Sequence, residues 1–158
     1  MLAPFGGGAL EHAKLSSWKQ VLQLYYLTKK LKNDMKIPAQ YNRIMPYLII
    51  PDAAGFSSFM KEVFAAEEQI LVPRSEGVIM HGELRIGDAV IMFADVTPEF
   101  TARPAGMFIY VDSVADTYAK AIAAGATSTM EPMQQPYGFT CGFKDKFGND
   151  WWPTEGAE

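Results

Sequence analysis

Two stretches of the chain decide its fold: residues 44–69, IMPYLIIPDAAGFSSFMKEVFAAEEQ, and residues 107–129, MFIYVDSVADTYAKAIAAGATST. In each stretch an apolar strand is followed by an acidic turn and an amphipathic helix, and each leads into further short strands. The order β-α-β-β-β therefore occurs twice. Because each helix covers one face of its sheet, the other faces of two curved half-sheets enclose a cavity, where we expect the functional site.

The repeat predicts one domain over residues 44–158, with a first module at 44–96 and a second at 106–153. The first helix is expected to bury residues spaced as one helix face: Phe56, Phe59, Met60, Val63 and Phe64. The second is expected to begin at the N-cap Ser113, to end near Gly125, and to bury Val114, Tyr118, Ala121 and Ile122. The predicted class is α+β, with eight strands and two helices in the domain.

Residues 1–43 are predicted to form an N-terminal extension containing one amphipathic helix. Ser17-Trp18-Lys19-Gln20 has the pattern of a capping box, and Val21, Leu22 and Tyr25 follow at helical spacing among lysines. One interpretation is a helix that docks on a membrane surface or a partner. The other, which we favour because the lysines form no dense cationic stripe, is a helix resting on the domain or a frayed tail.

Composition excludes several classes of function. The 158 residues are 49% hydrophobic and 20% charged, with a formal net charge of −4, so no basic footprint for nucleic acid is present. We find no basic, apolar leader at the N-terminus and no apolar run of the length, about 18 residues, that spans a membrane. The single cysteine fits a reducing compartment. We therefore expect a cytoplasmic protein with no nucleic-acid or membrane partner.

The strand over residues 79–86 carries the most polar candidate site. A period of two places His81, Glu83 and Arg85 on one face, and Met80, Gly82, Leu84 and Ile86 on the face buried under the helix. A histidine two residues from a carboxylate is consistent with a metal pair, with a general base and its orienting acid, or with a polar row that orients a ligand. We favour the polar row; if the protein is an enzyme, His81 and Glu83 are the catalytic candidates.

Other familiar chemistries are not supported by the sequence. One cysteine and two histidines, of which His12 lies in the extension, match no closed zinc spacing. Nucleophilic catalysis by Cys141 requires a base beside it, and His81 is the only candidate, so an inert, partly buried thiol is the better interpretation. The glycines at residues 6–8 follow no strand and open no helix, so they make no phosphate loop.

Aromatic residues at predicted strand and turn positions suggest an apolar pocket. Of Trp151 and Trp152, adjacent on one strand, we expect one in the core and one in the cavity or a subunit interface. The full set of predicted ligand-binding residues is Tyr47, His81, Glu83, Arg85, Met92, Tyr137, Phe139, Trp151 and Trp152.

Four segments together resemble the vicinal oxygen chelate superfamily, and within it the PhnB-like glyoxalase/bleomycin resistance proteins: residues 47–50, 81–88, 123–126 and 145–151. The resemblance covers roughly residues 44–153. It implies paired βαβββ modules, a cupped eight-stranded mixed sheet with the helices on its outer face, and a homodimer. Metal-dependent members hold a divalent cation with His, Gln or Glu side chains from the first, fourth, fifth and eighth strands.

The implied metal positions fall at or near Met45, Met92, Gly106 and Trp152, and none of these residues is a ligand for a hard cation. We therefore expect a metal-free, cofactor-free member that binds an apolar or aromatic small molecule. Two alternatives stay open. One is a lyase, isomerase or dioxygenase-type enzyme using His81 and Glu83, with or without a divalent metal. The other is an interaction module whose cup is filled by its own side chains.

Overall fold

The computed structural model describes residues 19–25 and 37–156. Contacts divide the chain into two units, Met1–Pro38 and Ala39–Glu158. In the first unit residues 19–25 are helical with exposed side chains, whereas His12 and the proposed capping residue Ser17 lie outside the described residues. No helix of the described ranges has the length and apolar character needed to cross a membrane.

The second unit contains the predicted repeat. The first module consists of β1 (Tyr47–Ile50), α2 (Ala53–Phe64), β2 (Glu67–Ser75), β3 (Val78–Ile86) and β4 (Ala89–Asp95). The second consists of β5 (Gly106–Tyr110), α3 (Val114–Ala123), β6 (Thr127–Gln135), β7 (Gly138–Lys144) and β8 (Asp150–Gly156). The α+β class and the βαβββ order of both modules are therefore confirmed.

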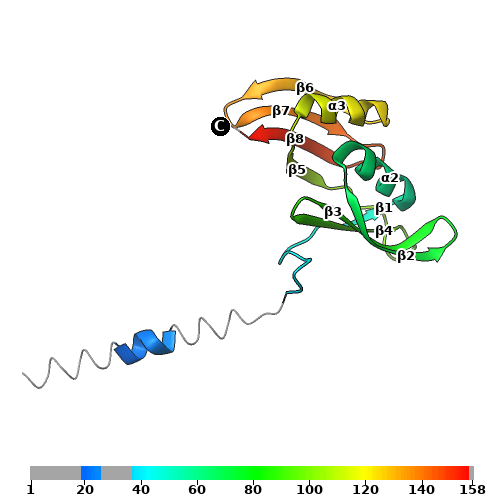
Figure 1. The fold of residues 1–158 in the computed structure, drawn as a ribbon. Helices are drawn as coiled ribbons and strands as arrows, with labels where there is room; N and C mark the ends of the chain where they lie inside the picture. The colour runs from blue at the N-terminus through cyan, green and yellow to red at the C-terminus, as the bar shows by residue number, and fades with distance from the viewer. Residues whose placement is uncertain (1–18, 26–36, 157–158) are drawn as a thin grey trace, which may run out of the picture. The chain divides into compact units, whose positions relative to one another are not determined.

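The strands form two separate four-stranded mixed sheets, in the orders β1-β4-β3-β2 and β5-β8-β7-β6 (Figure 1). In each, the first and last strands of the module run parallel and the other pairs are antiparallel. Tyr47 lies beside Met92, and Phe108 lies beside Trp152. The modules are thus paired as expected, but as two sheets and not as one continuous eight-stranded sheet.

Each helix begins at a pair of side-chain oxygens that accept its first N–H groups. The Asp52 carboxylate accepts from Gly55 N at 2.8 Å, and the Ser113 hydroxyl accepts from Asp116 N at 3.2 Å, which confirms the predicted N-cap. A second carboxylate comes from the last strand of the module: Asp95 accepts from the first helical N–H of α2, and Glu155 from that of α3. Negative charge at a helix N-terminus is stabilising, and the repeat uses it twice.

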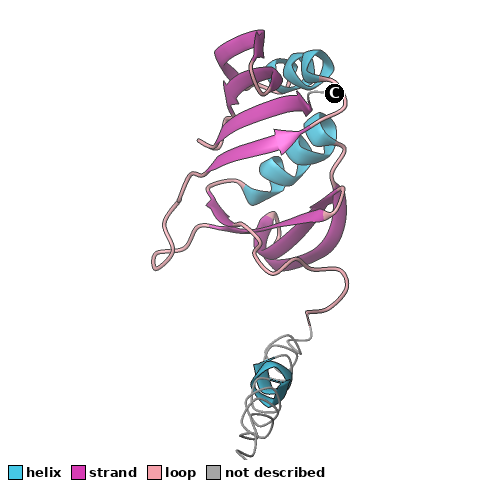
Figure 2. Cartoon of the chain, turned by 90° about the vertical axis from the view of Figure 1, so that its left-hand side faces the viewer, coloured by secondary structure: helices cyan, strands magenta, loops and turns pink. Residues whose placement is uncertain are grey.

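Helix α2 contributes five buried residues to the shared core. The predicted stripe Phe56, Phe59, Met60 and Val63 is buried, and Phe64 packs against it. Its rings contact both sheets: Phe56 meets Phe93 of β4 at 5.5 Å between centroids, and Phe64 meets Trp151 of β8 at 4.6 Å. Helix α2 accordingly lies between the sheets (Figure 2), so the face of each sheet that carries no helix is left open.

Two expected burials are wrong. Met80 is 47% exposed, and Ile79 takes its place in the core with 5% exposure. The reason is a break in the β2–β3 register, where Val72 pairs with His81 but Pro73 pairs with Ile79, so that Met80 is an extra residue. Ile122 is also exposed, because the buried face of α3 runs through Val114, Thr117 and Ala121.

Candidate functional site

Strand β3 brings the predicted polar residues to the open face of the first sheet. Glu83 pairs with Met92 of β4, which in turn pairs with Tyr47 of β1. His81 and Arg85 lie two residues away on either side, on the same face. The structure therefore brings together five of the predicted site residues: Tyr47, His81, Glu83, Arg85 and Met92.

Glu83 is the centre of a buried hydrogen-bond cluster on this face and is only 3% exposed. Its carboxylate accepts from the Tyr41 hydroxyl at 3.0 Å, from Gln69 Nε2 at 2.8 Å and from His81 Nε2 at 3.0 Å. Arg85 does not pair with Glu83. Instead its guanidinium donates to Gln69 Oε1 at 2.6 Å and to the main-chain oxygen of Gln40.

The acceptor-only nature of an ionised carboxylate orients the whole cluster. His81 must donate through Nε2 to Glu83, so in the neutral ring Nδ1 is an acceptor. The Tyr47 hydroxyl lies 3.1 Å from Nδ1 and therefore donates to it. The result is a chain of hydrogen bonds, Tyr47 to His81 to Glu83, in which the imidazole is held by a carboxylate on one side and a hydroxyl on the other.

The same contacts set the ionisation of the cluster. Burial raises the pKa of Glu83, but hydrogen bonds from His81, Gln69 and Tyr41 and the attraction of His81 outweigh burial, so the pKa lies below 4.5. The hydrogen bond to Glu83, with burial and the carboxylate charge, raises the pKa of Tyr41 above 10.0. At neutral pH Glu83 is thus a carboxylate surrounded by donors.

We predict that Glu83→Gln destabilises the protein by about 1–2 kcal/mol at neutral pH, because an amide cannot accept from all three donors. The folded pKa of Glu83 lies below that of the unfolded chain, so unfolding takes up a proton. The contribution of the Glu83 carboxylate to the free energy of unfolding is therefore fully present above pH 4.5. It is lost as the pH falls through the pKa of Glu83 in the folded protein. Denaturant unfolding of both proteins between pH 7 and pH 3 measures the difference.

The matched control is Glu68→Gln, which breaks an ion pair with Lys61 at the surface. That change is expected to cost less than about 1 kcal/mol. If Glu83→Gln behaved like Glu68→Gln, and kept the wild-type loss of stability in acid, the buried cluster would not be anchored by the Glu83 charge.

The open face of the second sheet is aromatic. Phe108, Tyr110, Tyr137 and Trp152 all remain exposed. The Phe108 ring lies 5.3 Å from that of Tyr110 and 6.2 Å from that of Tyr137. Trp152 and Tyr137, two of the predicted ligand-binding residues, are therefore on an open face. Contiguous exposed aromatic rings are uncommon on a monomer and mark interaction surfaces.

Two other predicted ligand-binding residues lie on the helix side of this sheet. Trp151 is 1% exposed, against 39% for Trp152, so one of the two tryptophans lies in the core as expected. The Trp151 indole donates to Asp145, and Phe139 packs against the core. Cys141 is buried, and burial and the charge of Glu131 raise its pKa to about 11, so its thiol stays protonated at neutral pH.

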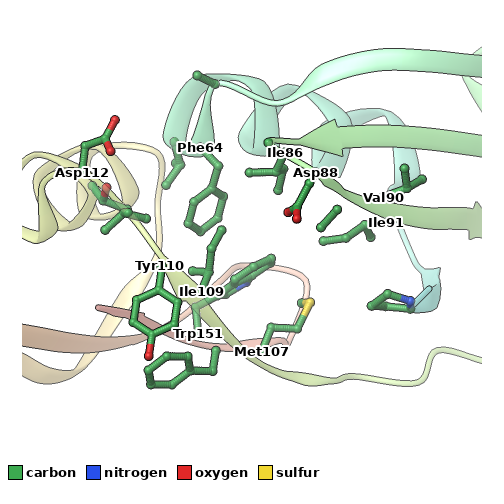
Figure 3. A pocket seen from close by; sticks show the side chains of 18 of the residues that line it. Phe64, Ile86, Asp88, Val90, Ile91, Met107, Ile109, Tyr110, Asp112 and Trp151 are labelled. Atoms are coloured by element: carbon green, nitrogen blue, oxygen red, sulfur yellow. The ribbon is translucent and has the colours of Figure 1, made fainter. Parts of the chain in front are cut away.

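Two hollows adjoin these surfaces. The larger, of about 700 Å³, is the inter-module crevice between the β3–β4 turn and β5. Figure 3 shows Phe64, Ile86 and Ile91 across this crevice from Met107, Ile109 and Trp151. The smaller, of about 340 Å³, is the Tyr47 hollow on the first sheet, lined by Tyr47, Ile49, Arg74, Met80, Ala94, Asp95, Thr97 and Phe100.

Only the Tyr47 hollow adjoins the polar cluster, because Tyr47 belongs to both. The inter-module crevice is larger but has mostly apolar walls and contains neither His81 nor Glu83. Both volumes fall within the range of about 300–1,000 Å³ that small-molecule sites occupy.

The positions that the family resemblance assigns to metal ligands do not fit a metal. Met92 offers a thioether, Gly106 has no side chain, and the Trp152 ring lies where a Gly106 side chain would project, 3.0 Å from an ideal Cβ. Among residues 19–25 and 37–156 no group of three or more His, Cys, Asp or Glu side chains is placed to hold an ion. The residues present do not form the metal site of the metal-dependent relatives.

Several site residues were missed at the sequence level. Phe108 and Tyr110 alternate on β5, and this period of two could have identified them. Arg74, which lies in β2, was not among the predicted site residues. Tyr41 and Gln40 were assigned to the extension, and no local pattern indicates that they lie over Glu83, which is 42 residues from Tyr41.

Comparison with known proteins agrees with this architecture. An uncharacterised protein of Mycobacterium tuberculosis (strain H37Rv) is 28% identical over 120 residues, covering 68% of this chain and 71% of its own. The crystal structure of TioX from Micromonospora sp. ML1 covers 73% of this chain and 99% of TioX, at 19% identity and a TM-score of 0.62. The match to TnmS3, an antibiotic binding protein from Streptomyces sp. CB03234, covers 78% of this chain and 98% of TnmS3, at 17% identity and a TM-score of 0.59.

At these identities the two solved structures show a common fold and no more. The family assignment comes from residues 40–152, which match the sequence pattern of a whole domain family and contain the first module and the second module up to Trp152 of β8. The chain belongs to the Glyoxalase/Bleomycin resistance protein/Dioxygenase superfamily.

Proposed function

We propose that this protein binds an apolar or aromatic small molecule on the open faces of its sheets, without a metal ion, as a cytoplasmic homodimer of the PhnB-like type. The observation that carries the proposal is the set of large aromatic side chains left exposed on both open faces, Tyr47 on the first and Phe108, Tyr110, Tyr137 and Trp152 on the second. Burying such rings is strongly favourable, and their flat faces suit a planar ligand.

The direction of these faces supports a homodimer. Both sheets share one core through α2, so their helix sides are turned toward each other and their open sides outward. Within one chain the polar cluster of the first sheet and the aromatic face of the second do not enclose a common cavity. A second copy, placed with its aromatic face over the polar cluster of the first, completes two equivalent cups by one isologous contact.

The chemistry of the two faces supports ligand binding. One contributes a hydrogen-bonding row of fixed orientation, Tyr47, His81 and Glu83, and the other contributes aromatic walls. Apolar walls with a few placed polar groups are typical of small-molecule sites. TnmS3, which shares the fold, is described as antibiotic binding, and this supports the same class of role. The single, protonated Cys141 is compatible with a reducing cytoplasm.

The test is binding of the neutral fluorescent aromatic N-phenyl-1-naphthylamine to full-length protein treated with EDTA. We expect saturable binding, unchanged by the chelator, to a protein that sediments as a dimer. Trp152→Ala is expected to weaken binding about fivefold or more, because it removes an exposed aromatic wall. Ile122→Ala, an exposed apolar residue on α3, is the control. A monomer that binds no probe, or equal effects of both variants, would overturn the proposal.

A second candidate, an enzyme of the same superfamily, is favoured by one specific observation. In the Tyr47–His81–Glu83 chain the hydroxyl donates to an imidazole that is held by a carboxylate. This is the arrangement by which a histidine takes a proton from a hydroxyl in acid–base catalysis. Elemental analysis of protein purified without a histidine tag separates the metal-dependent form of this candidate: one tightly held divalent ion per chain would favour it over metal-free binding.

A further inference from the structure

We infer that the Tyr47 hollow receives the negatively charged group of an aromatic organic acid, with Arg74 as its counter-ion. This inference rests on the proposed ligand-binding function and names the class of ligand. The observation behind it is a cation without a protein partner at the wall of a mostly apolar hollow.

Arg74 has no side-chain partner among the described residues, unlike three other basic residues of that part of the chain. Lys61 pairs with Glu68 at 2.7 Å, Lys144 pairs with Asp150 at 2.7 Å, and Arg85 donates to Gln69 and Gln40. Within residues 37–156 no hydrogen bond or ion pair engages the Arg74 guanidinium, and Arg74 is one of the residues that line the Tyr47 hollow. A guanidinium presents a planar set of donors that matches a carboxylate or sulfonate.

The carboxylates near the hollow do not neutralise Arg74. Asp95 also lines it, but this residue is buried and both of its oxygens accept main-chain N–H groups, from Ala53 at the start of α2 and from Ile79. Glu83 is enclosed by its own donors. The positive charge of Arg74 is therefore available to a bound anion, although the chain as a whole carries a formal charge of −4.

The rest of the hollow suits a ring. Ile49, Met80 and Phe100 provide apolar walls, and the last two are exposed without a ligand. Phe100 is held in place because its N–H donates to Thr97 Oγ1 and its carbonyl accepts from Thr97 N. The Tyr47 hydroxyl is turned to His81, and Tyr47 also lines the hollow. At about 340 Å³ the hollow is at the small end of ligand sites, which favours a compact molecule of one or two rings.

Two fluorescent probes with the same ring system test the inference: 8-anilinonaphthalene-1-sulfonate, which is anionic, and N-phenyl-1-naphthylamine, which is neutral. We expect Arg74→Gln to raise the Kd of the sulfonate about tenfold, the effect of losing one partly desolvated charge pair, and to change the Kd of the neutral probe less than about twofold. Arg74→Lys should retain an intermediate affinity, because it keeps the charge and loses the planar donors.

Lys120→Gln is the matched control, because it removes one positive charge from an exposed position on α3 and should leave both Kd values unchanged. Met80→Glu, which adds a negative charge to the hollow, should weaken the sulfonate more than the neutral probe. If both probes bound but Arg74→Gln affected them equally or not at all, the anion site would be refuted and ligand binding would stand. If neither probe bound the wild-type protein, both proposals would fail.

Discussion

Asp145→Ala is expected to lower the free energy of unfolding by about 3–5 kcal/mol, enough to remove much of the stability of a small domain. Asp145 is 3% exposed and lies in the turn between β7 and β8. One of its oxygens accepts from Phe147 N and Asn149 N, and the other from Asn149 Nδ2 and Trp151 Nε1, at 2.8–3.0 Å. Alanine leaves these donors buried and without their acceptor.

The effect should extend to the junction between the modules. Asn149 uses its own Oδ1 to accept from Ala105 N, at the end of the segment that links the modules, and Trp151 packs on Phe64 of α2. Urea unfolding followed by tryptophan fluorescence and by circular dichroism measures the loss. Without Asp145 the environment of Trp151 changes, so we also expect a shifted fluorescence maximum in the folded variant.

The control lies next to this turn, at the first residue of β8. Asp150→Ala removes a carboxylate that is 40% exposed and pairs with Lys144 at 2.7 Å, and it should cost less than about 1 kcal/mol. Equal destabilisation by the two alanine variants would mean that the turn depends on its charge and not on the buried hydrogen bonds of Asp145.

Gly82→Ala is the second large effect, with an expected loss of about 2–3 kcal/mol from overpacking. Gly82 lies between His81 and Glu83 and faces the core side of β3, where an added Cβ would lie 2.3 Å from Cζ of Phe93. Phe93 is fully buried and packs edge-on against Phe56, so its ring has no free space to enter. The strand must shift, and the Tyr47–His81–Glu83 hydrogen bonds must shift with it.

A double-mutant cycle identifies the cause. Phe93→Leu shortens the side chain that meets the new methyl group, so the pair Gly82→Ala and Phe93→Leu should be more stable than the sum of the single changes predicts, by about 1 kcal/mol or more. Gly156→Ala, at the end of β8 with nothing within 4 Å of its added Cβ, should be neutral. Additive single changes would contradict the steric explanation.

The fold was largely predictable because its signals are local. The spacing of Phe56, Phe59, Met60 and Val63 predicted the buried face of α2, and the alternation in residues 81–85 predicted one polar face on β3. The two wrong predictions, the burial of Met80 and of Ile122, concern a local irregularity and the end of a buried face. The extra residue at Met80 reverses the alternation for one position, and Ile122 follows the last buried turn of α3. Neither change alters the apolar pattern that the sequence displays.

The candidate site was predictable only in part. Alternation grouped His81, Glu83 and Arg85, but the donors that enclose Glu83 come from Tyr41 and Gln69, which lie 42 and 14 residues away. Arg85 lies on the predicted face, but its hydrogen bonds to Gln69 and to the main chain of Gln40 had no counterpart in the sequence pattern. Partners so far apart in the chain leave no periodic signal, because their contact depends on how the loops close over the sheet.

By itself the sequence determined the duplicated module, the helix cap at Ser113, and the identity of the polar row on β3, because all of these follow from spacing within a few residues. Only the tertiary structure decided that α2 lies between two separate sheets, that Trp151 is buried while Trp152 is exposed, and that Arg74 reaches an apolar hollow without a partner. The physical reason is that side-chain packing between distant segments, and not local conformational preference, determines which of two available faces is covered.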